Sequence, residues 1–447
     1  MTVGLVSLGC AKNQVNSEQM LCLLAEAGYE ITDRVDDVDV VVVNTCGFIE
    51  SAKSEAIAEI LELAALKAEG KIKKILVAGC LAQRYSDELL QELPEVDGLI
   101  GTGSFGDIVS AVDAVMEDRT PVLMDDINAP LEEIGRVLTT PDHWAYLKIA
   151  EGCDNRCAYC VIPSIRGRYR SRAMEDLIEE ASLLASDGTK ELIVVAQDTS
   201  RYGIDLYGER RLPALLTALC AIDGLEWVRV HYMYPDEITD ELLDVFEKEP
   251  KLVKYFDIPI QHCNDAILRA MHRRGSRAYL DTLLKKIRAR IPDAVIRTSL
   301  IAGLPGEDEA AFEELCAFLR EHRLERAGCF VFSPEEGTEA AEMEYPPTAV
   351  ARRRAEIIDE IQSRIMEDYN ASRLGKVMRV LCDGYDRIAE IHHGRTYADS
   401  PEVDGTVFFY SEKRIPAGTF VSVMIEETLD TDLVGYVVED AEEDDND

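Results

Sequence analysis

Short apolar runs alternate with helical patterns over the first 135 residues. Strand-like runs separated by helices of this length are typical of parallel strands joined by right-handed crossovers. We therefore expect residues 1–135 to form a doubly wound parallel α/β domain. The runs that predict its strands are VGLVSLGC, DVVVVNTC, KKILVAGC and DGLIGTG.

The pattern changes after the Pro-containing connector LTTPDHWAYL, and residues 140–375 carry six longer β/α units. Six units exceed what a small nucleotide-binding fold needs and fall short of the eight of a closed barrel. We therefore predict an open (β/α)6 barrel, a partial TIM-like barrel, which ends in a helical stretch from Thr348 to Gly375. Active sites of such barrels lie at the carboxyl ends of the strands.

The last part of the chain has a third pattern of apolar and polar residues. Residues 376–440 alternate apolar and polar positions between Gly-bearing turns, which predicts a small antiparallel β-barrel. Residues 441–447 are almost all acidic or polar and are predicted to be a disordered tail. We expect an α/β protein of three domains followed by this tail.

The chain is strongly acidic, with a formal net charge of −38 from 85 acidic and 47 basic side chains. Proteins that bind nucleic acid through its phosphates usually present a basic surface. Residues 376–447 are acidic instead, with 18 acidic and 6 basic side chains. RNA binding is therefore not favoured, and the charge serves either solubility alone or the attraction of a basic partner.

No apolar run approaches the roughly 20 residues of a transmembrane helix, and the N-terminus MTVGLVSLGCAKN lacks the features of a signal peptide. We expect a cytoplasmic protein without a membrane partner. The twelve cysteines are expected to stay reduced in that compartment. Clustered cysteines are then better explained as metal ligands or catalytic groups than as disulfides.

Three cysteines of the N-terminal domain, Cys10, Cys46 and Cys80, each end a predicted strand. Ligands of open parallel sheets bind outside the carboxyl ends of the strands, so these thiols can converge although they are far apart in sequence. We predict a shared metal site. The alternative is that each is a buried core cysteine, which is common for single cysteines.

Three further cysteines, Cys153, Cys157 and Cys160, lie in the stretch AEGCDNRCAYCVIPSIRG after the first predicted barrel strand. A structural zinc site needs four ligands, commonly two C-x2-C pairs, and the sequence has no second pair. Three thiolates on a four-iron cluster leave one iron open, and an open position is typical of a catalytic metal site. The spacing therefore predicts a catalytic iron-sulfur cluster.

This loop resembles that of the radical S-adenosylmethionine superfamily, whose C-x3-C-x-aromatic-C pattern is matched by Cys153, Cys157, Tyr159 and Cys160. The resemblance implies a [4Fe-4S] cluster whose open iron chelates the methionyl group of S-adenosylmethionine. It also implies one-electron cleavage of the sulfonium, which releases a 5′-deoxyadenosyl radical able to remove hydrogen from an unactivated carbon. Tyr159 is then expected to line the adenine.

Over essentially the whole chain, the order of domains is similar to that of the methylthiotransferases. That family has an N-terminal domain with three separated cysteines, a radical barrel and a TRAM-type β-barrel. The resemblance implies a second [4Fe-4S] cluster on Cys10, Cys46 and Cys80, and a second S-adenosylmethionine as methyl donor. It also implies an electron donor and a sulfur donor as partners.

Local stretches such as KIAEGCDNRCAYCVIPSIRGRYRSR and DIPIQHCNDAILRAMHRRG resemble the ribosomal-protein branch of this family (RimO type). That branch modifies the β-carbon of an aspartate in small-subunit ribosomal protein twelve, and a basic protein substrate agrees with the acidic charge. The alternative within the family is a tRNA adenosine methylthiotransferase, which predicts a basic patch facing RNA. Outside it, the alternatives are a non-enzymatic iron-sulfur protein and a zinc-binding interaction module.

The resemblance also suggests contacts to S-adenosylmethionine. Gln197, at the end of the second barrel strand, is expected to bind the methionine amino group. Ser299 and Gly303, in SLIAGLPGE, resemble the stretch near the adenosine, where glycine lets the backbone approach closely. Alternating arginines after the cysteine loop either pair with a carboxylate of the substrate or of S-adenosylmethionine, or form a solvated basic edge. They are Arg166, Arg168, Arg170 and Arg172.

Overall fold

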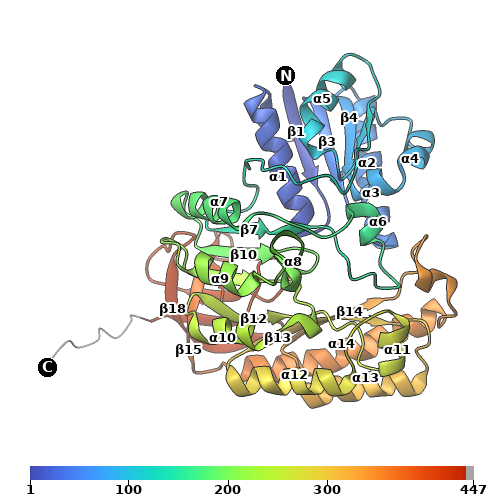
Figure 1. Cartoon of the computed structure of the whole chain (residues 1–447). Coiled ribbons are helices and arrows are strands. Elements are labelled where there is room, and N and C mark those ends of the chain that lie inside the picture. The colour runs from blue at the N-terminus through green and yellow to red at the C-terminus, as the bar shows by residue number, and fades with distance from the viewer. Residues whose placement is uncertain (439–447) are drawn as a thin grey trace.

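Three structural units follow one another in a computed structural model of the chain, which describes residues 1–438 (Figure 1). The acidic tail predicted at residues 441–447 lies outside the described residues. No helix within residues 1–438 is both long and apolar enough to cross a membrane.

The N-terminal unit contains a six-stranded parallel sheet in the order β2-β1-β3-β4-β5-β6. Its strands are β1 (Thr2–Ser7), β2 (Glu30–Thr32), β3 (Val38–Thr45), β4 (Ile72–Gly79), β5 (Gly98–Ile100) and β6 (Val122–Leu123). Its helices are α1 (Ala11–Glu26), α2 (Glu50–Ala68), α3 (Cys80–Arg84), α4 (Ser86–Glu92), the 3-10 turn η1 (Phe105–Asp107) and α5 (Ile108–Met116).

Side chains of the central strand β3 alternate between two cores. Val40 and Val42 pack with α1 and α5 on one face of the sheet, whereas Val41 and Val43 pack with α2 and α4 on the other. Helices therefore cover both faces, and the prediction of a doubly wound α/β domain is confirmed.

The second unit contains six parallel strands in the order β14-β13-β12-β11-β10-β7. The edge strands β7 and β14 are not paired with each other in this sheet, so the barrel is open, as predicted. Its strands are β7 (Trp144–Lys148), β10 (Glu191–Val195), β11 (Trp227–Val230), β12 (Leu252–Asp257), β13 (Val295–Ala302) and β14 (Arg326–Val331); a separate pair is formed by β8 (Ala150–Glu151) and β9 (Arg170–Ser171).

Helices cover the outer face of this open barrel and share one large apolar core with its strands. The last of them, α14, packs along the edge strand β14. The helices are α6 (Ile162–Arg166), α7 (Met174–Ser186), η2 (Thr199–Arg201), α8 (Ile204–Tyr207), α9 (Leu212–Cys220), η3 (Pro235–Glu237), α10 (Asp240–Lys248), α11 (Asp265–Ala270), α12 (Arg277–Arg290), α13 (Glu309–His322), η4 (Glu339–Glu342) and α14 (Thr348–Ala371).

The third unit is a closed barrel of five strands in the order β15-β16-β17-β19-β18, which confirms the predicted small β-barrel. All neighbouring strands are antiparallel except β17 and β19, which run parallel. The strands are β15 (Val377–Asp386), β16 (Ile391–Arg395), β17 (Val407–Tyr410), β18 (Phe420–Leu429) and β19 (Asp432–Val437).

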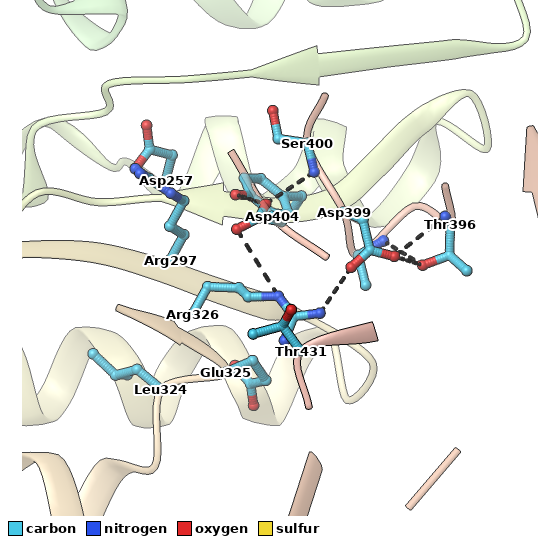
Figure 2. A network of polar contacts seen from close by, with 12 residues as sticks. Asp257, Arg297, Leu324, Glu325, Arg326, Thr396, Asp399, Ser400, Asp404 and Thr431 are labelled. Atoms are coloured by element: carbon cyan, nitrogen blue, oxygen red, sulfur yellow. Dashed lines mark hydrogen bonds and ion pairs between the residues drawn. The ribbon is translucent and has the colours of Figure 1, made fainter. Parts of the chain in front are cut away.

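The small barrel docks against the open barrel through buried polar contacts made by the loop between β16 and β17 (Figure 2). The Arg326 guanidinium pairs with Asp399 of this loop at 2.7 Å. The Ser400 hydroxyl lies 3.0 Å from Nε2 of His231. These side chains are buried, and Ala398 of the loop packs with Trp227 and Tyr255, on the side of the sheet that faces away from the helices.

The N-terminal unit reaches the same inner side of the open barrel through α1, which runs down toward β7 (Figure 1). Val15 of α1 is fully buried in a cluster with Trp144 and Tyr146 of β7 and Ile193 of β10. Tyr232, which follows β11, packs against this cluster. The first turns of α1 therefore lie at the mouth of the open barrel.

Candidate functional site

Three cysteines of the N-terminal unit lie where neighbouring strands end. Cys10 precedes α1, Cys46 directly follows β3, and Cys80 begins α3 after β4. Gly9 has a φ of +95°, and a Cβ atom there would lie 2.8 Å from Cβ of Cys46. Only glycine allows these loops to approach so closely. The fold thus brings the three thiols, called the N-terminal set below, to one edge of the sheet.

Two cations influence the N-terminal set. Burial alone would raise the pKa of Cys10, but nearby Lys12 and Arg166 outweigh it and leave that pKa below its ordinary value. Burial and the neighbouring Cys80 raise the pKa of Cys46 to about 11. Burial also raises the pKa of Cys80 in spite of Arg166. Cys10 is therefore the thiol of this set that loses its proton most readily, as a metal ligand must.

The second set of thiols, Cys153, Cys157 and Cys160, lies in the loop between β8 and α6 and is called the barrel set. The loop is held by its own backbone, since the Cys153 amide donates to the Gly167 carbonyl at 3.1 Å and the Cys160 amide to the Cys157 carbonyl at 3.0 Å. Burial raises the pKa of Cys153 to about 11 and that of Cys160 further. Thiols so buried ionise only when a positive group binds them.

A buried arginine accompanies the barrel set. Nη1 of Arg273 lies 3.8 Å from Sγ of Cys157, and its guanidinium stacks on the Tyr234 ring at 4.1 Å. Among the ion pairs of residues 1–438, none includes Arg273, although only 8% of this residue is exposed. A buried cation requires an anion nearby. The three thiols therefore fit an anionic group such as an iron-sulfur cluster.

The spacing of both sets does not suit a single metal ion. Within residues 1–438, the one group of three ligating side chains whose ligand atoms all lie within 4.8 Å of one another is Asp281, Glu321 and His322, whose two acids both pair with Arg277. Zinc holds thiolates about 3.8 Å apart in a tetrahedron with bonds of about 2.3 Å. The wider thiol sets fit a group of several iron atoms.

A buried polar network joins Cys80 of the N-terminal set to Glu151 and Arg166, which flank the loop of the barrel set in the chain. Nη2 of Arg166 lies 3.4 Å from Sγ of Cys80, and its Nη1 donates to Glu151 at 3.0 Å. Glu151 also accepts hydrogen bonds from Lys148 and from Gln197, each at 3.0 Å. Burial alone would raise the pKa of Glu151, but the two cations lower it well below its ordinary value. The carboxylate therefore stays ionised between the sets.

Family comparisons divide the chain as the fold does. The uncharacterized protein family UPF0004 matches residues 2–101, the radical SAM superfamily matches residues 147–319, and the TRAM domain matches residues 374–438. The barrel set lies in the second match and the N-terminal set in the first.

Relatives match along almost the whole chain. The "Ribosomal protein uS12 methylthiotransferase RimO" of Pelotomaculum thermopropionicum is 49% identical over 444 residues, which cover 98% of this chain and 99% of the relative. The protein of the same name from Anaeromyxobacter sp. (strain Fw109-5) is 47% identical and covers 98% and 93%. The chain therefore belongs to the family of ribosomal protein uS12 methylthiotransferases (RimO). It is a radical S-adenosylmethionine methylthiotransferase, with [4Fe-4S] clusters and S-adenosylmethionine as cofactors.

Solved structures of other radical enzymes share the fold. The methyltransferase TsrM from Kitasatospora setae, with cobalamin and a [4Fe-4S] cluster bound, gives a TM-score of 0.55 at 13% identity and covers 76% of this chain and 73% of its own. The cobalamin-dependent enzyme OxsB gives a TM-score of 0.51 at 12% identity and covers 82% and 56%. The predicted radical barrel is thus confirmed at the level of the fold.

Gln197 is one of the residues expected to contact S-adenosylmethionine in this methylthiotransferase, and its side chain has a free hydrogen-bond acceptor among the described residues. Its amide nitrogen donates to Glu151, which leaves Oε1 as an acceptor. This oxygen is buried and has no hydrogen-bond partner among the described residues. A buried acceptor without a donor is costly. An ammonium group is a donor that would satisfy it.

The other expected contacts lie around the end of β13. Tyr159 packs on an apolar cluster that contains Leu304, and Ser299 is a residue of β13 itself. Gly303 has a φ of +85°, and a Cβ atom there would lie 2.4 Å from Cβ of Ala351 in α14. The need for glycine at this position is therefore explained by the packing of α14 and not only by the approach of a ligand.

Three of the four alternating arginines are engaged within the protein. Arg166 takes part in the network described above, and Arg172 pairs with Glu133 and Glu180. Arg170 donates to backbone carbonyls. Arg168 is exposed. Internal acceptors already bind the three engaged side chains, and only Arg168 is solvated as a basic edge requires.

The sequence analysis did not identify several residues of the site in this methylthiotransferase. Lys12, Glu151 and Arg273 all lie within three residues of a cysteine or in a basic stretch, but no spacing rule marks them. Their importance depends on which charges they meet after folding. The signal that identifies such residues as part of the site is the burial of their charge, and only the structure shows this burial.

Proposed function

We propose that this chain methylthiolates the β-carbon of an aspartate in small-subunit ribosomal protein uS12, with two [4Fe-4S] clusters and S-adenosylmethionine. The names of its relatives support the substrate protein. The observation that carries the site assignment is the link between the two thiol sets, since Arg166 contacts Cys80 and follows Cys160 by six residues. Neighbouring clusters suit a reaction that removes hydrogen from a carbon and then inserts sulfur there.

Two sets of three cysteines hold the clusters in this proposal. When bound, the clusters and S-adenosylmethionine supply the electron, the hydrogen-abstracting radical, the sulfur and the methyl group. Because each set provides three thiolates, one coordination position in each stays open for a substrate. The sets are Cys10, Cys46 and Cys80, and Cys153, Cys157 and Cys160.

The remaining residues bind and orient the reactants around these sets. Gln197 accepts a hydrogen bond from the methionyl ammonium at its buried Oε1. Tyr159 lines the adenine, and Ser299 and Gly303 lie beside the adenosine. Since α1 packs at the mouth of the barrel, the N-terminal unit limits access of water to this space.

The acidic charge supports a basic protein partner. A net charge of −38 attracts a basic protein and repels the phosphates of RNA. The reaction also needs an electron donor and a sulfur donor. We place it in the cytoplasm, where ribosomal proteins are made.

An anaerobic turnover experiment tests the substrate. The full-length protein is reconstituted with iron and sulfide and supplied with a reductant and S-adenosylmethionine, with uS12 and unmodified tRNA offered in parallel. Mass spectrometry is expected to find a methylthio increment on an aspartate-containing peptide of uS12 alone. An increment on tRNA alone would show that the substrate assignment is wrong. Formation of 5′-deoxyadenosine with neither increment would point to another substrate.

Cysteine variants test the two sets separately. Cys153→Ala is expected to abolish formation of 5′-deoxyadenosine. Cys10→Ala is expected to keep it and to lose the methylthio product. Cys22→Ala changes a partly buried cysteine of α1 outside both sets and serves as the control. Loss of 5′-deoxyadenosine in Cys10→Ala as complete as in Cys153→Ala would contradict this division of roles.

A further inference from the structure

Lys12 is a buried cation that pairs with no carboxylate of residues 1–438. Only 7% of the residue is exposed, and its Nζ lies 3.6 Å from the centre of the Tyr232 ring. Among the ion pairs of residues 1–438, none includes Lys12. Burial of an ammonium group is costly unless an anion or several acceptors compensate it, and an aromatic ring does so only in part.

The position of Lys12 places this charge beside the N-terminal set, at the mouth of the open barrel. It is the second residue of α1 and follows Cys10 of the N-terminal set by two positions. Tyr232 follows β11 and packs beside the mouth of the open barrel, where Val15 of α1 is buried. The ammonium group therefore lies where the N-terminal unit meets the barrel.

Two kinds of anion can compensate Lys12, a cluster or a substrate carboxylate. Each thiol set already has its own buried arginine, since Arg166 contacts Cys80 at 3.4 Å and Arg273 contacts Cys157 at 3.8 Å. Lys12 is a third cation, which also helps to lower the pKa of Cys10, but its ammonium group, unlike the two guanidinium groups, makes no hydrogen bond to a thiol within residues 1–438. Three of the four arginines after the cysteine loop are engaged elsewhere, so Lys12 is the buried cation left to meet an incoming carboxylate.

The chemistry of the proposed substrate fits this position. The β-carbon of an aspartate is bonded directly to the side-chain carboxylate, so a cation that holds the carboxylate also fixes the carbon that reacts. An ammonium group with three rotatable donors can bind either carboxylate oxygen. An asparagine at the same place offers the ammonium only a neutral amide oxygen, so the attraction between opposite charges is lost.

We propose that Lys12 binds the side-chain carboxylate of the substrate aspartate and makes the enzyme selective for an acidic residue. This inference rests on the proposed function. It assigns to the N-terminal unit a part in substrate recognition in addition to holding thiols.

Binding measurements with uS12 and a variant whose target aspartate is replaced by asparagine test the proposal. The full-length reconstituted enzyme is used with S-adenosylmethionine and without reductant, so that binding is measured without turnover. Lys12→Met keeps the aliphatic stem over Tyr232 and removes the charge, Lys12→Arg keeps the charge, and Arg168→Met removes an exposed cation as the matched control. Iron content and the cluster absorption spectrum are recorded for each variant.

Wild type is expected to bind the aspartate form at least tenfold more tightly than the asparagine form. Lys12→Met should raise the Kd of the aspartate form at least tenfold and leave that of the asparagine form unchanged. Lys12→Arg should keep most of the preference, and Arg168→Met should keep all of it.

Two results overturn the proposal for Lys12 alone. One is an unchanged preference for aspartate in Lys12→Met. The other is loss of iron in Lys12→Met, which would mean that the ammonium serves the cluster. Failure of the wild-type enzyme to bind or modify uS12 would instead contradict the proposed function. The inference about Lys12, which rests on that function, would then also be wrong.

Discussion

His231 is a buried histidine that the fold keeps neutral. It follows β11 and lies 3.0 Å from the Ser400 hydroxyl of the small barrel, and only 4% of it is exposed. Burial, together with the nearby cations Arg229, Arg297 and Lys12, lowers its pKa from 6.5 to about 3 in spite of Asp257. Its protonation is therefore coupled to the docking of the small barrel.

The sign and size of the pH effect follow from these two pKa values. Below pH 6.5 the unfolded chain binds a proton at this histidine, whereas the folded protein does not until the pH approaches 3. Stability is therefore lost as the pH falls through this window, because the unfolded state binds more protons. At about 1.4 kcal/mol per pH unit, this group lowers the free energy of unfolding by about 2 kcal/mol between pH 7 and pH 5.

The assay compares wild type with His231→Gln, which keeps a polar group beside Ser400 but cannot titrate. Both tryptophans, Trp144 and Trp227, are buried in barrel strands, so tryptophan fluorescence during urea unfolding reports on the barrel. The free energy of unfolding of wild type relative to the variant is expected to fall by about 2 kcal/mol from pH 7 to pH 5.

His272→Gln, the same change at an exposed histidine, is the control for the substitution itself. A direct check is the NMR titration of the His231 ring, which should stay neutral throughout this range. Parallel stability curves for wild type and His231→Gln, or a titration midpoint near that of free histidine, would refute the reasoning.

Three further predictions concern the network between the thiol sets. Glu151→Gln leaves two buried cations without their shared carboxylate and should lower the free energy of unfolding by about 3–5 kcal/mol. Glu180→Gln, whose two arginine partners each keep a second glutamate, should cost less, and equal losses would contradict the argument. Arg166→Gln removes a positive charge beside Cys80 and should lower the midpoint potential of the N-terminal cluster by roughly 60 mV, a tenfold change in its redox ratio. Potentiometric EPR titration measures this, and a potential equal to that of Arg168→Gln would speak against it. Gln197→Leu should weaken S-adenosylmethionine binding about tenfold at unchanged iron content, because the ammonium loses an acceptor; an unaltered Kd would exclude this contact.

The elements that sequence reasoning predicted are those with local signals. Short apolar runs that alternate with helical patterns, and the strand-end positions of Cys10, Cys46 and Cys80, sufficed to predict a doubly wound domain with thiols at one edge. The C-x3-C-x2-C spacing was sufficient to predict an iron-sulfur cluster in the loop that carries the barrel set. The role of Gly303 was predicted less completely, because the contact that requires glycine comes from Ala351, far along the chain.

Residue types at short, fixed spacings were enough to predict the order of the three domains and the two sets of thiols. Which charges meet depends on how the folded segments pack. Arg166 belongs to the cysteine loop, yet it binds Asn13, Asn16 and Cys80 of the N-terminal unit. Lys12 has no carboxylate partner in the part of the chain that the structure describes. Periodicity and spacing are local properties, whereas the partner of a buried charge is set by packing between distant segments.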